Sequence, residues 1–320
     1  MTPASSKPFA VGIDLGGTKI AVGLCRGGHI EKKVVTPTPA KDGPDAIISA
    51  MIQAAREAMV GVDVDEIAGV GVGAAGQIDP KTGAVLYAPN LYWKNVPLAE
   101  KLKVGLLLPV RVVNDVRAAT IAEFRYGSGK GLSDFVNVFV GTGIGSGFVL
   151  NGRLLEGVTN SAGEIGHICL DPDGPLCGCG QKGCLEAYSS GRGMERFVMT
   201  QLVQGVKSRI NELVEGDPRK VTGKVIGTAA REGDELAQAA LHRVGKYLGL
   251  ALANVHTMVN PQRIALGGGV MALKEFIMPS LDKSLKKHIL PVAVQDPLVV
   301  MASCENDAAV IGSAALFTEF

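Results

Sequence analysis

The sequence lacks a marked excess of charge of either sign, since 32 Lys and Arg residues face 31 Asp and Glu residues, for a formal net charge of +1. A protein that follows a nucleic-acid backbone usually presents a basic face, so this balance argues against nucleic acid as a partner. The densest basic stretch, residues 283–287, falls on a predicted helix, and we interpret it as a solvated face.

The sequence also lacks a long apolar run and a secretory leader. Its longest uncharged stretches, residues 135–150 and 247–262, are shorter than the roughly 20 residues of a membrane-spanning helix. Its start, MTPASSKPF, has no basic region followed by an apolar core and a cleavage site. We therefore expect a cytoplasmic protein without a membrane partner. In that compartment, clustered cysteines are more often metal ligands than disulfides.

The sequence is rich in apolar residues, which make up 47% of its 320 positions. This length exceeds what one core usually organises, so two domains are expected. Residue patterns predict strands at 9–14, 19–25, 30–35, 67–74, 110–113, 135–140, 148–150, 153–155, 263–266 and 298–302. They predict helices at about 44–59, 117–126, 235–258 and 308–318. Strands that alternate with helices, with an antiparallel hairpin opening each half, predict a mixed-sheet α/β protein of two similar lobes.

The two predicted hairpins share a spacing. Gly17 aligns with Gly141 and Thr18 with Thr142 at an offset of 124 residues, which we interpret as a weak internal duplication. The alternative is a chance match between two glycine-rich hairpins.

Three glycine-rich turns follow predicted strands. Backbone amides in such turns approach phosphate oxygens closely, and a carboxylate at the strand end can orient a hydrated Mg²⁺. The turns comprise Asp14, Gly16, Gly17, Thr18 and Lys19, then Gly141, Thr142 and Gly143, and finally Gly267, Gly268 and Gly269. A strand follows the first two, which argues against a P-loop or a dinucleotide-binding turn. Each turn alone is equally compatible with a tight hairpin.

Asn114 and Asp115 end a predicted buried strand. A carboxylate there projects into a crevice beside the phosphate turns, where it can accept a hydroxyl proton as general base. The alternative is an Asp that caps the helix beginning near Val116.

The segment from residue 163 to 191 concentrates four of the six cysteines. Three thiolates and one imidazole form the ligand set of a closed structural Zn²⁺ site, here His167, Cys177, Cys179 and Cys184. Cys169 alternates with His167 in a strand-like stretch and is left out. Separate free thiols are the alternative. A closed site leaves no water position, so the metal would hold the loop and leave Glu164 and Glu186 for a polar substrate.

These motifs together resemble the ROK family (repressor, open reading frame, kinase), and within it the sugar kinases of the glucokinase type. The likeness runs from Val11 to about Ala315 and rests on DLGGTK, PNLYWKNVPL, ND, GTGIGSG, GEIGH, CGCGQKGCLE and LGGGV.

The resemblance implies an actin-like, ribonuclease-H-like fold of two lobes with an interdomain cleft. One lobe would comprise residues 1–116 and 305–320, because the closing helix would fold back, and the other residues 117–304 with the zinc-binding loop. It further implies a homodimer that transfers phosphate from Mg·ATP to a hexose 6-hydroxyl. Asp115 would be the base, the three glycine turns would contact ATP, and the sugar would contact Asn90, Asn114, Glu164, His167 and Glu186. Zinc would bind His167, Cys177, Cys179 and Cys184.

Two departures from the family pattern concern substrate preference. Arg117 follows the Asn114-Asp115 pair where many relatives carry Asn, and Gln77 replaces a commoner Pro. Glucose is the expected hexose, with N-acetylmannosamine or another amino sugar as the alternative. A sugar-responsive repressor is a rival, although only about eight residues precede the first strand, too few for a helix-turn-helix domain. A sugar-binding scaffold without catalysis is a third possibility.

Overall fold

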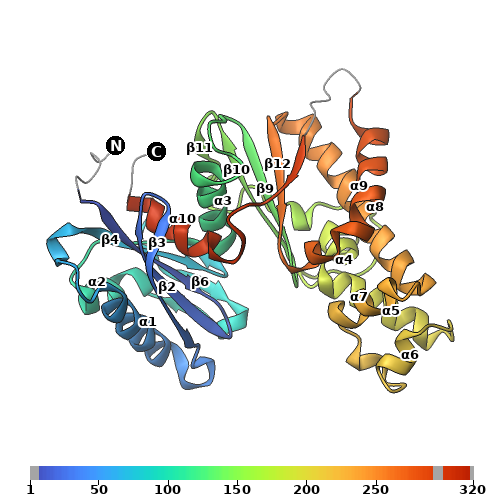
Figure 1. Ribbon diagram of the computed structural model, residues 1–320, viewed down its shortest axis with the longest axis horizontal. Helices are drawn as coiled ribbons and strands as arrows, with labels where there is room; N and C mark the ends of the chain where they lie inside the picture. Colours follow the sequence, from blue (N-terminus) through green and yellow to red (C-terminus); the bar gives the residue numbers. More distant parts are fainter. Residues whose placement is uncertain (1–6, 291–297, 318–320) are drawn as a thin grey trace. The chain divides into compact units, whose positions relative to one another are not determined.

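The computed structural model describes residues 7–290 and 298–317 (Figure 1). The chain divides into two compact units. The first unit comprises Met1–Asn137, Gly147–Gly163 and Ala302–Phe320, and the second comprises Val138–Ser146 and Glu164–Met301. The C-terminal segment thus shares a unit with the N-terminal sheet. In the structure, residues 117–137 group with this first unit. The domain boundary expected after residue 116 remains a prediction.

The first unit is built on a five-stranded sheet in the order β3-β2-β1-β4-β8. Its strands are β1 (Phe9–Leu15), β2 (Lys19–Arg26), β3 (His29–Pro37), β4 (Ile67–Ala74) and β8 (Val110–Asn114). The first three strands are antiparallel, and β4 and β8 run parallel to β1. The carboxyl ends of β1, β4 and β8 therefore meet at one edge of the sheet, which brings Asp14 and Asn114 to that edge.

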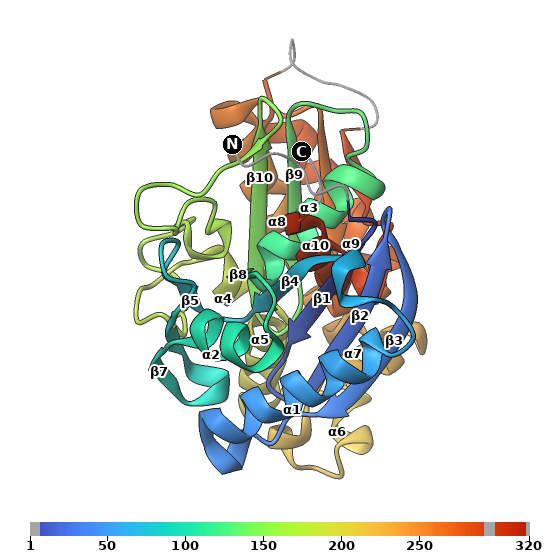
Figure 2. The same cartoon turned by 90° about the vertical axis from the view of Figure 1, so that its left-hand side faces the viewer.

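Helices cover both faces of this sheet (Figure 2). On one face lie α1 (Gly43–Met59) and α2 (Leu98–Leu106), and on the other lie α3 (Asp115–Tyr126) and α10 (Ala308–Ala314). The α10 face is lined by small residues, because the helix backbone comes very close. A Cβ at Gly12 would lie 1.9 Å from the Val310 carbonyl oxygen, and one at Gly71 would lie 1.8 Å from that of Ser313.

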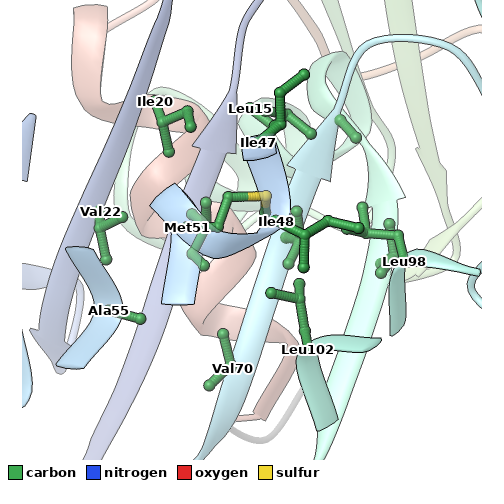
Figure 3. Close-up of a cluster of buried hydrophobic side chains, with 14 of the residues drawn as sticks. Leu15, Ile20, Val22, Ile47, Ile48, Met51, Ala55, Val70, Leu98 and Leu102 are labelled. Atoms are coloured by element: carbon green, nitrogen blue, oxygen red, sulfur yellow. The ribbon is translucent and has the colours of Figure 1, made fainter. Parts of the chain in front are cut away.

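The main core of the first unit fills the opposite face. Ile47, Ile48 and Met51 of α1, together with Leu98 of α2, pack on β-strand residues such as Leu15 (Figure 3). The apolar positions of α1 recur at spacings of three and four, so they form one helix face. Burying such a side chain stabilises the fold by about 1.5 to 3 kcal/mol.

A small three-stranded sheet, absent from the sequence prediction, completes the first unit. It comprises β5 (Gln77–Ile78), β6 (Val85–Ala88) and β7 (Trp93–Val96). The short helix η3 (Pro89–Leu91) joins β6 to β7 and carries Asn90.

The second sheet repeats the strand order of the first, as β11-β10-β9-β12-β13. Its strands are β9 (Phe135–Val140), β10 (Ile144–Leu150), β11 (Arg153–Leu154), β12 (Arg263–Gly267) and β13 (Val299–Met301). The shared order agrees with the internal duplication predicted from the 124-residue offset. The second unit adds helices α4 (Leu185–Ser189), α5 (Gly191–Val203), α6 (Ile210–Leu213), α7 (Gly223–Arg231), α8 (Glu235–Val259) and α9 (Lys274–His288).

One predicted boundary is wrong by four residues. The sequence assigned residues 141–147 to a turn, whereas β10 already begins at Ile144. The glycines there serve close packing within the strand, since a Cβ at Gly147 would lie 2.2 Å from Thr120 Oγ1. At the C-terminus, α10 ends at Ala314 and a single 3-10 turn follows, while Thr318 lies outside the described residues. Across the ranges described above, no helix is both long and apolar enough to span a bilayer.

Candidate functional site

The first glycine turn lies against Asn90. A Cβ at Gly17 would lie 3.3 Å from the Asn90 carbonyl oxygen, so a side chain there would crowd η3. The turn itself is closed by the Gly16 amide, which donates to the Lys19 carbonyl oxygen at 3.1 Å. Thr38 fixes its other side, because its Oγ1 donates to the Gly16 carbonyl oxygen at 2.7 Å. The structure thus holds this turn rigidly beside a residue predicted to bind sugar.

Asn114, and not Asp115, caps α3. The Asn114 Oδ1 accepts from the amides of Val116 at 3.0 Å and Arg117 at 3.3 Å, and Nδ2 donates to the Gly76 carbonyl oxygen at 3.3 Å. The alternative of a capping Asp is therefore wrong, since the cap is one residue earlier. Because Oδ1 is occupied by the cap, Asn114 fixes the helix start and so positions the next residue.

Asp115 is the first residue of α3, and its Oδ1 accepts from the Val116 amide at 2.9 Å. Burial raises the pKa of the Asp115 carboxyl, although hydrogen bonds to backbone amides oppose that shift. A raised pKa makes the carboxylate a stronger base toward a hydroxyl proton. The neighbouring Asp14 has its pKa raised to about 6, first by burial and then by the charge of Asp115. Two carboxylates therefore share one edge of the first sheet.

In the second unit, the other glycine turns line a pocket of about 630 Å³. Of the residues predicted to contact ATP, Gly141, Thr142 and Gly269 line this pocket, whereas Gly143, Gly267 and Gly268 are not among its lining residues. The amide of Gly191, at the start of α5, donates to the Gly141 carbonyl oxygen at 2.8 Å, which docks that helix on the turn.

The remaining walls of the pocket come from α5, α7 and the turn before α9, which the sequence analysis did not identify. They supply Arg192, Glu195, Lys224, Thr228 and Arg231. The Glu195 Oε1 accepts from the Gly223 amide at 2.8 Å and so joins α5 to the start of α7. A signal was present, since Thr222 and Gly223 precede Lys224 as a helix start, with the Thr222 side chain accepting from the Val225 amide. Cationic and hydroxyl groups beside a glycine turn suit a polyphosphate.

Gly143 makes room for Glu186. The Glu186 Oε2 accepts from the Ile144 amide at 2.9 Å, and a Cβ at Gly143 would lie 2.5 Å from that oxygen. The other oxygen, Oε1, lies 3.7 Å from Cys177 Sγ. Glu186 therefore joins the second glycine turn to the cysteine-rich loop, and one of its oxygens is already committed to the backbone.

The four predicted metal ligands come together. The ligand atoms of His167, Cys177, Cys179 and Cys184 all lie within 4.8 Å of one another. Cys179 Sγ and Cys184 Sγ are 3.7 Å apart, and Cys177 Sγ is 3.8 Å from His167 Nδ1. Ligands of tetrahedral Zn²⁺ lie about 3.6 to 3.8 Å apart, so this set fits a closed four-coordinate site. Cys169 is outside the cluster, as predicted, because its backbone pairs with Cys184 while its thiol lies near the Lys182 carbonyl oxygen.

Glu164 precedes a short turn, η4 (Ile165–His167), and His167 is its last residue. The His167 amide donates to the Glu164 carbonyl oxygen at 3.0 Å. The turn rests on β10, since a Cβ at Gly166 would lie 2.3 Å from the Ile144 carbonyl oxygen. With Nδ1 of His167 turned toward the cysteines, Nε2 is the ring nitrogen left for another ligand.

Comparison with known proteins places these features in one family. Residues 10–319 match the model of the ROK family. The chain is 36% identical to the glucokinase of Streptomyces coelicolor, with 97% of this chain and 98% of that protein covered. It is 35% identical to the glucokinase of Thermotoga maritima, with 97% of each covered. The structure is similar to that of the ROK family glucokinase from Streptomyces griseus in complex with glucose and AMPPNP, with 34% identity and a TM-score of 0.81 over 96% of this chain and 98% of that one.

Proposed function

Because the chain belongs to the ROK family, we propose that it transfers the γ-phosphoryl group of ATP to the 6-hydroxyl of a hexose, with glucose as its substrate. Its fold is the actin-like α/β fold of the ROK sugar kinases, and its two five-stranded sheets have the same strand order. The single observation that carries the proposal is the near full-length likeness to glucokinases. The half-buried Asp115 at the start of α3 agrees with it.

Asp115 accepts the proton of the sugar hydroxyl as that oxygen attacks the γ-phosphorus. The bond from the γ-phosphorus to the β,γ-bridging oxygen breaks, and ADP leaves. Because the transition state of phosphoryl transfer is loose, positioning and charge stabilisation supply most of the rate, and a positioned base adds about 10²- to 10⁴-fold. The Asn114 cap fixes the Asp115 backbone, and so the direction of its carboxylate.

Mg·ATP is the second substrate. In the second unit, the turn at Gly141 and Thr142 and the cation of Lys224 bind its phosphates in the 630 Å³ pocket. In the first unit, Asp14 orients the hydrated Mg²⁺, and the turn from Gly16 to Lys19 contacts the terminal phosphate. These assignments are supported by the composition of the turns and by the lining of the pocket.

Sugar contacts are assigned from both units. We assign Asn90 and Asp115 of the first unit, and Glu164, His167 and Glu186 of the second, to sugar hydroxyls. Asn114 keeps one amide hydrogen for the same purpose. The support is the placement of each residue within its own unit, beside a glycine turn or the cysteine cluster.

The Cys₃His cluster is assigned to one structural Zn²⁺. When bound, zinc would supply cross-linking of the loop and no catalytic water, because all four positions are filled by His167, Cys177, Cys179 and Cys184. The chain's own residues then fix the sugar side: Nδ1 of His167 faces the metal and Nε2 faces a hydroxyl. The cytoplasm remains the predicted location, since ATP and reduced thiols are both supplied there, and the homodimer remains a prediction.

A coupled assay of ADP release over a panel of hexoses tests the function. Glucose is expected to give the highest kcat/KM, followed at a distance by mannose, fructose, N-acetylglucosamine and N-acetylmannosamine. A higher kcat/KM for N-acetylmannosamine would assign the chain to the amino-sugar kinases. Glucose binding without ADP release would favour a regulator or a scaffold.

A further inference from the structure

A second groove, of about 750 Å³, lies between α8 and α9 in the second unit. These helices run side by side in close contact (Figure 1). Glycine allows this approach, because a Cβ at Gly245 would lie 2.2 Å from the Ile277 carbonyl oxygen and one at Gly249 would lie 2.4 Å from that of Leu281. The groove shares no described lining residue with the nucleotide pocket.

The groove is lined by cations from both helices. Lys246 and Arg243 come from α8, and Lys283 and Lys287 come from α9. Lys283 and Lys287 are four residues apart, so their side chains share one helix face. Within the described chain, no Asp or Glu lines the groove, and none of its three lysines forms an ion pair. Residues 283–287 were interpreted from the sequence as a solvated face, and their lysines are indeed exposed. Two of them, Lys283 and Lys287, line the groove.

Two features show that the groove is organised around polar groups. The Arg243 guanidinium lies over the rings of Tyr188, Phe197 and Tyr247, with 4.6 Å to the Tyr188 centroid, so its position is fixed by stacking. Ser284 lines the groove and is only 7% exposed, yet its Oγ has no hydrogen-bond partner among the described residues. A buried hydroxyl without a partner is rare, and it indicates a missing acceptor or donor.

A histidine completes the set. The His288 Nδ1 lies 2.8 Å from the Ser284 carbonyl oxygen, and because a carbonyl only accepts, Nδ1 carries the hydrogen. The Nε2 atom is therefore the nitrogen that remains for a ligand or for water.

We propose that this groove binds an anion with two or more phosphate groups, of the class of a sugar bisphosphate or a short polyphosphate. Four positive charges without paired carboxylates favour phosphate oxygens, and Ser284 Oγ supplies a donor at the base. The volume of the groove exceeds what one tetrahedral anion fills. The site is separate from the nucleotide pocket, and it does not depend on the proposed kinase activity.

Isothermal titration calorimetry on the full chain tests the site. Tripolyphosphate, a sugar bisphosphate and inorganic phosphate are titrated separately, with the nucleotide pocket saturated by a non-hydrolysable ATP analogue. We expect tripolyphosphate or the bisphosphate to bind to one site, with inorganic phosphate at least tenfold weaker; the tighter of the first two identifies the source of the phosphate. No heat above dilution, or inorganic phosphate binding as tightly as both, would overturn the proposal.

Variants locate the binding. The double substitution Lys283→Gln and Lys287→Gln should weaken it at least tenfold, whereas Lys286→Gln, on the same helix turn but outside the groove, should change it less than twofold. Equal effects of the double variant and Lys286→Gln would contradict the location. If the double variant changed the sedimentation coefficient without changing anion affinity, the groove would be an interface between copies instead.

A second variant separates binding from folding. Ser284→Ala should weaken anion binding about threefold or more without lowering the melting temperature of the anion-free chain, because the hydroxyl has no partner to lose. Unchanged anion affinity in Ser284→Ala, with the charges intact, would remove Ser284 from the site and contradict the argument from its unpartnered hydroxyl.

Discussion

Asp115 stands where strand β8 ends and helix α3 begins, and this residue is half-buried. Asn114 supplies the helix cap, and the Asp115 carboxylate accepts only from the Val116 amide through Oδ1. This division of roles between adjacent residues explains why a cap and a base can follow one another in the sequence. A substitution of Asp115 alone therefore tests the proposed mechanism.

Asp115→Asn should lower kcat by about 10²- to 10⁴-fold, because the amide is isosteric but does not accept the hydroxyl proton. Calorimetry should show a glucose Kd within about threefold of wild type, since hydrogen bonding to the sugar is largely kept. Asp65→Asn, at an exposed turn, is the control and should leave both values unchanged. Retention of more than a tenth of the wild-type kcat would reject Asp115 as the base.

Asp14 gives a prediction for the pH dependence of stability. Its pKa of about 6 in the folded chain lies above the ordinary value of 3.8, first because it is buried and then because Asp115 is near. The folded state thus favours the protonated form, so its contribution to stability is full below pH 3.8 and is lost as the pH rises through 6.

Asp14→Asn removes this ionisation. The variant should exceed wild type in free energy of unfolding by up to about 3 kcal/mol at pH 7.5, and the difference should vanish near pH 4. Urea unfolding at both pH values measures it. A difference that is the same at the two pH values would show that Asp14 is not held in this environment.

At the scale of single elements, the cysteine-rich loop and α7 each contribute to the proposed site as a segment and not through one residue alone. Glu186 bonds to the second glycine turn through one oxygen and lies beside Cys177 through the other. If the cluster holds zinc as proposed, loss of the metal should also weaken the contact of Glu186 with the backbone beside the second glycine turn.

Cys179→Ser should reduce bound zinc from about one ion per chain to a small fraction and lower the melting temperature by several degrees, because a three-ligand site binds zinc much more weakly. Mass spectrometry of the metal and thermal unfolding give the two readouts. Cys169→Ser is the matched control, since Cys169 lies in the same loop but outside the cluster. Wild-type protein that carries no zinc after purification without chelators would refute the assignment.

Helix α7 places Lys224 in the wall of the 630 Å³ pocket, where we propose that the ATP phosphates bind. Lys224→Ala should raise the KM for ATP about tenfold, or about 1.4 kcal/mol of lost binding, with the KM for glucose unchanged. Lys220→Ala, just before the helix and outside the pocket, should leave both values at the wild-type level. An unchanged KM for ATP in Lys224→Ala would mean that the phosphates lie elsewhere.

For the whole molecule, prediction from sequence was accurate where one local pattern decides the outcome. The strands β4 and β9 were predicted with the observed bounds, because each is a mostly apolar run in a buried sheet. The start of β10 was missed, because Gly145 and Gly147 have the composition of a turn, and the contact of Gly147 with Thr120 of α3 cannot be read from the sequence.

The candidate site shows the same division. The four metal ligands lie within one short segment of the sequence, and each glycine turn is a continuous run of residues, so their chemistry was predictable. The walls of the proposed nucleotide pocket were not predictable, because Arg192 and Lys224 reach it only through the packing of α5 and α7 against the turn at Gly141. The groove between α8 and α9 was likewise invisible, since it needs two helices brought together at Gly245.

The most direct test of the central claim follows the sugar itself. Glucose labelled with ¹³C at carbon 6 is incubated with the wild-type chain and Mg·ATP, and both the carbon and the phosphorus spectra are recorded. We predict that the carbon-6 resonance acquires a coupling to phosphorus while one ADP forms for each glucose consumed. An unaltered carbon-6 resonance, with ADP formed by hydrolysis or with phosphate on another carbon, would contradict phosphorylation of the 6-hydroxyl.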